Sequence, residues 1–145
     1  MRTATCSVTP FFFQRMKGRH AVRFINLTDH AVHVIRMDGS RLRIDPSGEI
    51  LRYRERLEPC AELNGIDVYH IVGGTYVMIH ATSGISTAGL PPRMADTLYI
   101  VSKICLQSMQ VDRNDFVSPG QAVKDSVGNV IGCKGFLRYS PFLER

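Results

Sequence analysis

Short β-type runs alternate with turn residues along most of this chain, and that alternation constrains the fold more than any other feature. The runs "VRFINL" (22–27) and "AVHVIRM" (31–37) are rich in the β-branched and aromatic residues that strands favour. "TLYIV" (97–101) is apolar throughout, which is typical of a strand buried on both faces. We therefore predict a fold made mainly of short strands.

Turn residues between these runs predict how the strands connect. "PSG" at 46–48 separates "RLRID" from "EILRYRERL", and we expect a hairpin there. Gly73-Gly74 separates "IDVYHIV" from "TYVMIHA" and predicts a second hairpin. Two further turns are expected at Asp38-Gly39-Ser40 and at Val127-Gly128-Asn129.

One helix is expected, directly after the buried run. Ser102 is a good N-cap residue for a short helix within "SKICLQSMQV" (102–111). Together these features predict the α+β class: a mostly antiparallel or mixed sheet with one short helix after a buried strand. We expect residues 19–145 to form a single domain and residues 1–18 to be a loosely ordered tail.

Size and charge limit the functions to consider. The chain has 145 residues and a formal net charge of +5, which favours anionic partners such as nucleotides, nucleic acid or acidic proteins. No apolar run approaches the ~18 residues of a membrane span, and no export signal is recognisable, so we expect a cytoplasmic protein. The four cysteines are widely spaced, so we expect free thiols, no metal site and no cofactor.

A polar cluster lies between the first two β-type runs, in "NLTDH" (26–30). Its side chains suit a turn, because Asn and Thr can hydrogen-bond the nearby backbone. Alternatively, Asn26, Thr28 and His30 line a ligand pocket at the end of a strand, where their donors and acceptors would suit a base or ribose.

Five arginines follow the period of two that a strand imposes. Arg41 and Arg43 share one face of a strand, with Leu42 and Ile44 on the other. Arg52, Arg54 and Arg56 likewise share one face, with Leu51, Tyr53 and Leu57 opposite. If the two strands pair around residues 46–48, all five arginines lie on one face. That face is either solvated or an anion-binding surface for phosphate or nucleic acid.

Two further groups of residues are weaker candidates for a site. Ser102 and Lys103 begin the expected helix, where free backbone N–H groups can bind phosphate, although a plain N-cap is the simpler interpretation. Cys133 could act as a nucleophile if the fold brought it to His30, but a small buried residue in a strand is the ordinary role.

Four segments in this order resemble a family of small uncharacterised proteins from phages, prophages and their bacterial hosts. The family has an Asn-Leu-Thr-Pro-His motif, written here as "NLTDH" with Asp29 in place of proline. The other three segments are "PSGE", "GLPP…DTLYIVSKI" and "VKDSVGNVIGCKGF", and the resemblance spans residues 22–138. It implies a phage or prophage setting, in which small proteins often counter host defence.

We therefore expect a counter-defence binding protein that sequesters a nucleotide-type immune signal or blocks a host immune protein, without catalysis. Sequestering pockets often form between subunits, so a homo-oligomer is also expected. Two alternatives remain: a nucleotide-directed hydrolase that uses His30, and a nucleic-acid or protein-interaction module that uses the arginine face.

Overall fold

A computed structural model describes residues 21–109 and 113–138. The tail expected at residues 1–18 lies outside these ranges. The described chain is mostly β-sheet with one short helix, as the sequence predicted. No helix in the described ranges is long and apolar enough to cross a membrane.

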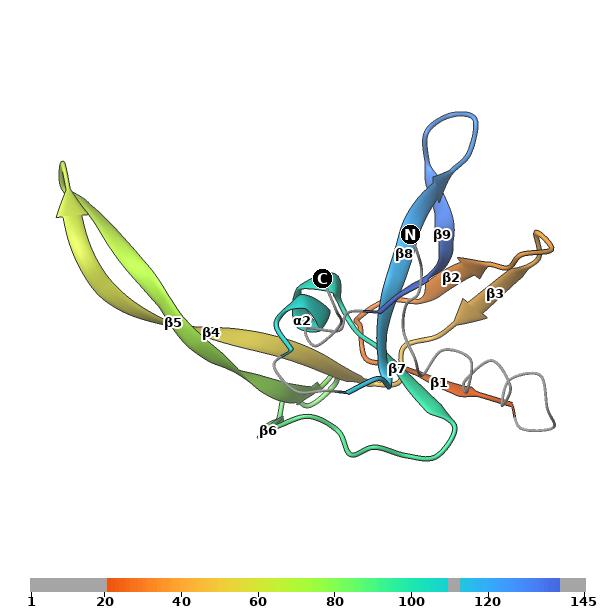
Figure 1. Ribbon diagram of the computed structural model, residues 1–145, viewed down its shortest axis with the longest axis horizontal. Helices are drawn as coiled ribbons and strands as arrows, with labels where there is room; N and C mark the ends of the chain where they lie inside the picture. The colour runs from red at the N-terminus through yellow and green to blue at the C-terminus, as the bar shows by residue number, and fades with distance from the viewer. Residues whose placement is uncertain (1–20, 110–112, 139–145) are drawn as a thin grey trace.

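Six short strands form a mixed sheet in the order β1-β7-β8-β9-β2-β3 (Figure 1). The pairs β1–β7, β7–β8 and β2–β9 are parallel, whereas β8–β9 and β2–β3 are antiparallel. The bounds of these strands are β1 Arg23–Asn26, β2 Val32–Ile35, β3 Arg41–Ile44, β7 Thr97–Ile100, β8 Phe116–Lys124 and β9 Val130–Leu137.

The six-stranded sheet curls until its two edge strands meet. A parallel bridge joins Asn26, the last residue of β1, to Pro46, which lies just beyond β3. All six strands contribute side chains to one apolar cluster inside the curl. That cluster contains Phe24, Val32, Val34, Leu42, Ile44, Ile100, Val117, Cys133 and Phe136.

A second apolar cluster covers the outside of the curled sheet. The short helix α2 (Lys103–Gln107) contributes Cys105 and Leu106, whereas its Ile104 is exposed to solvent. Tyr99 and Phe116 reach the same cluster from β7 and β8. As predicted, the Ser102 hydroxyl caps α2 by accepting a hydrogen bond from the Cys105 N–H at 3.3 Å.

The third component is a long antiparallel hairpin of β4 (Glu49–Leu63) and β5 (Ile66–His80), with the short β6 (Ser86–Ala88) on its edge. Its base packs on the second cluster, and the Tyr76 hydroxyl donates to the Cys105 carbonyl at 2.9 Å. Burial raises the pKa of Tyr76, so the phenol stays neutral and keeps its proton for this bond. The rest of the hairpin extends away from the curled sheet as an arm (Figure 1).

Both hairpins predicted from "PSG" and Gly73-Gly74 are wrong. β3 pairs with β2, whereas β4 belongs to a different sheet. The two strands separate because Pro46 forms a bridge with Asn26 of β1 and the Ser47 N–H donates to the Asn26 carbonyl oxygen. Residues 66–80 form one continuous strand, in which Gly73 accommodates a register shift with a φ of 141°. The turn of the long hairpin is instead at Asn64-Gly65, where both residues have positive φ.

The other two predicted turns are confirmed. Asp38-Gly39-Ser40 connects β2 to β3, and the Asp38 carboxylate accepts hydrogen bonds from the Ser40 N–H and hydroxyl. These bonds lower the pKa of Asp38. The segment at 127–129 connects β8 to β9.

Candidate functional site

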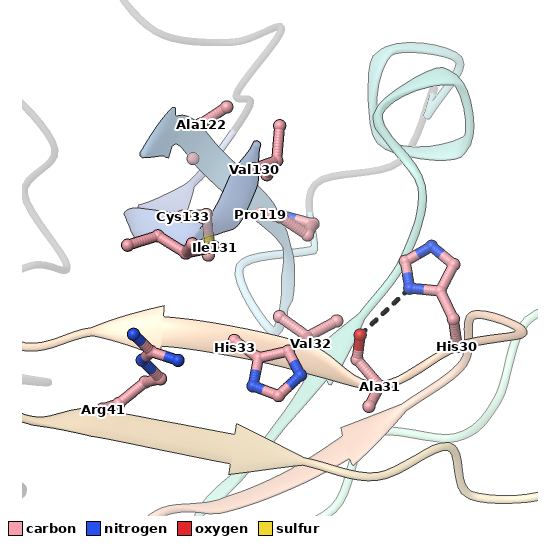
Figure 2. A pocket seen from close by; sticks show the side chains of 12 residues that line it. His30, Ala31, Val32, His33, Arg41, Pro119, Ala122, Val130, Ile131 and Cys133 are labelled. Atoms are coloured by element: carbon pink, nitrogen blue, oxygen red, sulfur yellow. Dashed lines mark hydrogen bonds between the residues drawn. The ribbon is translucent and has the colours of Figure 1, made fainter. Parts of the chain in front are cut away.

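A cleft of about 460 Å³ opens where β2 and β9 separate (Figure 2). The two strands pair only at Val34 with Cys133 and at Ile35 with Lys134. On the N-terminal side of this short ladder the cleft lies between the start of β2 and the β8–β9 hairpin. Its walls are formed by His30, Ala31, Val32, His33, Arg41, Pro119, Gly120, Ala122, Val130, Ile131, Gly132 and Cys133.

The cleft has an apolar wall and a basic wall. In Figure 2 the small and branched side chains of β8 and β9 face the strands that carry His33 and Arg41. Neither the His33 side chain nor the Arg41 side chain has a hydrogen-bond or ionic partner among the described residues. Among the described residues no carboxylate lines the cleft, so none of the described lining competes with a bound anion for these two side chains.

The hairpin register places the two basic side chains on one face. His33 lies opposite Arg43, and Ile35 lies opposite Arg41, so His33 and Arg41 are diagonal neighbours across the β2–β3 ladder. Arg43 shares that face, but its Nε donates to Asp45 Oδ1 at 2.6 Å. Arg41 is therefore the unpaired guanidinium of this hairpin.

His30 stands at the entrance to the cleft. Its Nδ1 lies 3.0 Å from the Ala31 carbonyl oxygen, and its Nε2 lies 3.9 Å from Asp29 Oδ1. The other oxygen of the Asp29 carboxylate lies 3.5 Å from Arg52 Nη2. Arg52 thus reaches the NLTDH turn from β4, although it does not line the cleft.

Asn26 and Thr28 occupy the interior of the NLTDH turn rather than a binding surface. The Asn26 amide donates to the carbonyls of His30 and Ile44, and its Oδ1 accepts from the N–H and hydroxyl of Thr28. Asn26 is 1% exposed and Thr28 is 7% exposed. Because these bonds use their polar groups within the protein, the geometry favours the structural alternative for both residues.

The single face of five arginines does not form, and that prediction is wrong. Arg41 and Arg43 lie on β3 of the curled sheet, whereas Arg52, Arg54 and Arg56 lie on β4 of the other sheet. The prediction rested on pairing these two strands, which do not pair. Only Arg41 of the five lines the cleft.

Ser102 and Lys103 lie outside the cleft as well. The Ser102 hydroxyl caps a helix of only five residues, which leaves the plain N-cap role. Cys133 and His30 both line the cleft but come from its two facing walls. Within the described ranges, no group of three or more His, Cys, Asp or Glu is arranged to hold a metal ion.

A second hollow of about 680 Å³ lies at the other end of the β2–β9 ladder, beside the Asp38 turn. Its lining includes the Asp38 carboxylate together with Arg36 and Lys134. The carboxylate makes this hollow a poorer site for an anion than the cleft.

No family model, curated protein or solved structure matches this chain. The resemblance to the phage and prophage family therefore stays a prediction. Of the site residues predicted from sequence, the structure gathers His30 and Arg41 at one cleft and adds His33. The Asp38-Gly39-Ser40 turn could have revealed His33, because the β2–β3 register puts it on the face of Arg41.

Proposed function

We propose that this protein binds an anionic small molecule of the nucleotide type in the cleft between β2 and β9, without chemical turnover. The observation that carries the proposal is the pair His33 and Arg41, two basic side chains that face an apolar wall and have no partner among the described residues. A guanidinium with no protein partner is a strong donor for a phosphate or carboxylate.

The two walls suit the two ends of such a ligand. A base or similar flat ring would pack on Val130, Ile131 and Pro119, and a phosphate would lie against Arg41 and His33. The cleft volume is within the range of small-molecule sites in proteins.

A sequestering role follows from the family resemblance rather than from the cleft. A protein that withholds a nucleotide-derived immune signal needs affinity and a preformed pocket, and it needs no catalytic group. Blocking a host immune protein is the alternative within the same counter-defence setting. Both place the protein in the cytoplasm of a bacterial host.

The test is thermal unfolding of the whole chain with nucleotides, cyclic dinucleotides and ADP-ribose derivatives, followed by analysis of the recovered compound. A ligand at ~100 times its dissociation constant should stabilise the fold by roughly 2.7 kcal/mol. The substitution Arg41→Ala should weaken binding about 10- to 100-fold, because it removes one charge-assisted hydrogen bond. Arg54→Ala is the matched control, since Arg54 is an exposed arginine outside the cleft.

Each outcome separates the proposal from its rivals. A shift that Arg41→Ala reduces, with the ligand recovered intact, supports binding without turnover. Equal losses from Arg41→Ala and Arg54→Ala would point to diffuse charge and contradict the cleft. No shift with any compound would exclude the tested classes and leave a host protein as the partner.

A hydrolase is the second candidate, because both His30 and His33 line the cleft and Asp29 lies 3.9 Å from His30. A histidine beside a carboxylate can act as a general base. Turnover of the bound compound, abolished by His30→Ala with affinity retained, would favour this reaction over sequestration.

A further inference from the structure

The long hairpin has an outer part whose side chains are mostly exposed among the described residues. Beyond Arg54 its strands leave the second cluster, and we call residues 55–72 the distal arm. Nine residues of strand at ~3.3 Å each give an arm about 30 Å long. A two-stranded ribbon of this kind is marginally stable in water by itself.

Apolar side chains lie in cross-strand pairs along the distal arm. Leu57 lies opposite Ile71 and Pro59 opposite Tyr69, on the ribbon face that carries Tyr53 and Tyr76 at the base. Leu57, Tyr69 and Ile71 are 52%, 51% and 63% exposed. We call Leu57, Pro59, Tyr69 and Ile71 the apolar arm face. These two neighbouring cross-strand pairs of exposed apolar residues differ from the single exposed apolar residues that are normal on a surface.

Between the apolar arm face and the base of the hairpin, this ribbon face carries Glu55 opposite Gly74. At the base of the hairpin this ribbon face packs on α2, through Tyr76 and Cys105. On α2 itself, Ile104 is 68% exposed and Lys103 is exposed beside it. Figure 1 shows the arm curving away from the base on the side where α2 lies, which leaves an open concave side.

Charge separates the distal arm from the rest of the protein. The distal arm holds four carboxylates and one arginine, a formal charge of −3. The remaining described residues hold twelve Lys or Arg and seven Asp or Glu, a formal charge of +5. An acidic arm and a basic body on the same chain attract each other between copies, and opposite charges at contact favour one orientation. The acidic side chains of the distal arm are Glu55, Glu58, Glu62 and Asp67.

We propose that a second copy of this chain covers the distal arm, and that each protomer lays its acidic arm against the basic body of its partner. The apolar arm face supplies the buried contact, and the partner's exposed apolar and basic groups, such as Ile104 and Lys103, receive it. Such an exchange is reciprocal, so it closes as a symmetric dimer and exposes no further arm. It is independent of the cleft, which lies on the curled sheet.

Light scattering of the whole chain across the micromolar range tests the dimer. We expect the wild type to be dimeric. The double variant Leu57→Ser/Ile71→Ser should raise the dissociation constant of the dimer by tenfold or more, about the effect of losing an apolar anchor. Val127→Ser is the matched control, because Val127 is 80% exposed in the turn between β8 and β9. This control should remain dimeric.

A charge variant tests the same contact without altering apolar residues. Glu58→Lys/Glu62→Lys should weaken the dimer, whereas Glu49→Lys at the base of β4 should have little effect. Circular dichroism of every variant checks that the fold is retained.

A wild type that is monomeric throughout would overturn the proposal, and so would a dimer that neither arm variant weakens. A monomer whose arm amides resist hydrogen exchange would show that another part of the same chain covers the arm. A monomer with an exchanging arm would leave a different protein as its partner.

Discussion

The side chain of Asn26 joins the two edges of the curled sheet: its Nδ2 donates to the carbonyl oxygen of Ile44 at 3.1 Å. The same nitrogen donates to the His30 carbonyl at 2.9 Å, and Oδ1 accepts from the Thr28 N–H at 3.0 Å. One buried amide therefore shapes the NLTDH turn and ties the end of β1 to the end of β3. The turn itself places His30 at the cleft, and β2, which follows it directly, carries His33 there.

Removing the Asn26 amide should destabilise the whole fold. Asn26→Ala removes a donor from the Ile44 carbonyl and the acceptor of the Thr28 N–H, at roughly 1–3 kcal/mol each, and we expect a loss of roughly 2–4 kcal/mol in total. Urea unfolding followed by circular dichroism measures this. Gln121→Ala removes an exposed amide from β8 and is the matched control. A loss below about 0.5 kcal/mol would show that Asn26 does not hold the edges together.

A buried ion pair should matter far more than an exposed one of similar length. Arg113 Nε donates to Asp115 Oδ1 at 2.8 Å, and these side chains are only 16% and 4% exposed. Asp115→Ala leaves the Arg113 charge buried, so we expect a loss of about 3–5 kcal/mol. Asp45→Ala breaks the Arg43 pair, which is 64% and 70% exposed, and should cost about 0–1 kcal/mol. Equal losses of unfolding free energy for Asp115→Ala and Asp45→Ala, measured by urea unfolding, would contradict the difference in burial between the two ion pairs.

Acid should weaken the β8–β9 turn through Asp125. Backbone hydrogen bonds, chiefly from Asn129, lower the pKa of this carboxyl below its usual 3.8. A lowered pKa in the folded state means that the unfolded chain binds the proton first as the pH falls. The contribution of the ionised Asp125 to the free energy of unfolding is therefore complete well above pH 3.8, and it is lost as the pH falls through the folded-state pKa.

The variant Asp125→Asn should reduce this acid sensitivity. We expect its urea midpoint to fall less than that of the wild type between pH 6 and about pH 3, where ordinary aspartates titrate. Because Asp38 also has a lowered pKa, Asp125→Asn/Asp38→Asn should flatten the dependence further. Identical pH profiles for the wild type and both variants would refute the role of these turns.

The sequence predicted local elements better than their partners. "TLYIV" became the buried β7, and Ser102 caps a helix, because both depend on nearby residues. β3 and β4 were wrongly paired, since the period of two fixes which side chains share a face but not which strand lies alongside. The separation of β3 from β4 depends on the bridge between Asn26 and Pro46, a contact between residues twenty positions apart in the sequence.

The candidate site was predictable only in part, for the same reason. His30 and Arg41 were identified from residue type, but their meeting depends on β2 lying between β3 and β9. His33 required the β2–β3 register. Both Asn64-Gly65 and Gly73-Gly74 are hairpin-type dipeptides, and Asn-Gly is the stronger signal for a tight turn. The prediction of a turn at Gly73-Gly74 overlooked this difference.

Gly74 serves close packing rather than a turn, and its substitution tests that role. A Cβ at Gly74 would lie 2.4 Å from the ring of Tyr53 and 2.7 Å from the Arg54 carbonyl oxygen. Tyr53 lies across the ladder from Tyr76, with ring centroids 4.9 Å apart, and both rings pack on the second cluster. Gly74→Ala should therefore push Tyr53 out of place and cost about 1–3 kcal/mol, as overpacking does.

Thr75→Ala, at the neighbouring exposed position, is the matched control in urea unfolding, and near-ultraviolet circular dichroism reports the tyrosine environment. If Gly74→Ala unfolds at the wild-type midpoint with an unchanged tyrosine signal, Gly74 has room for a side chain and the close approach of Tyr53 is wrong.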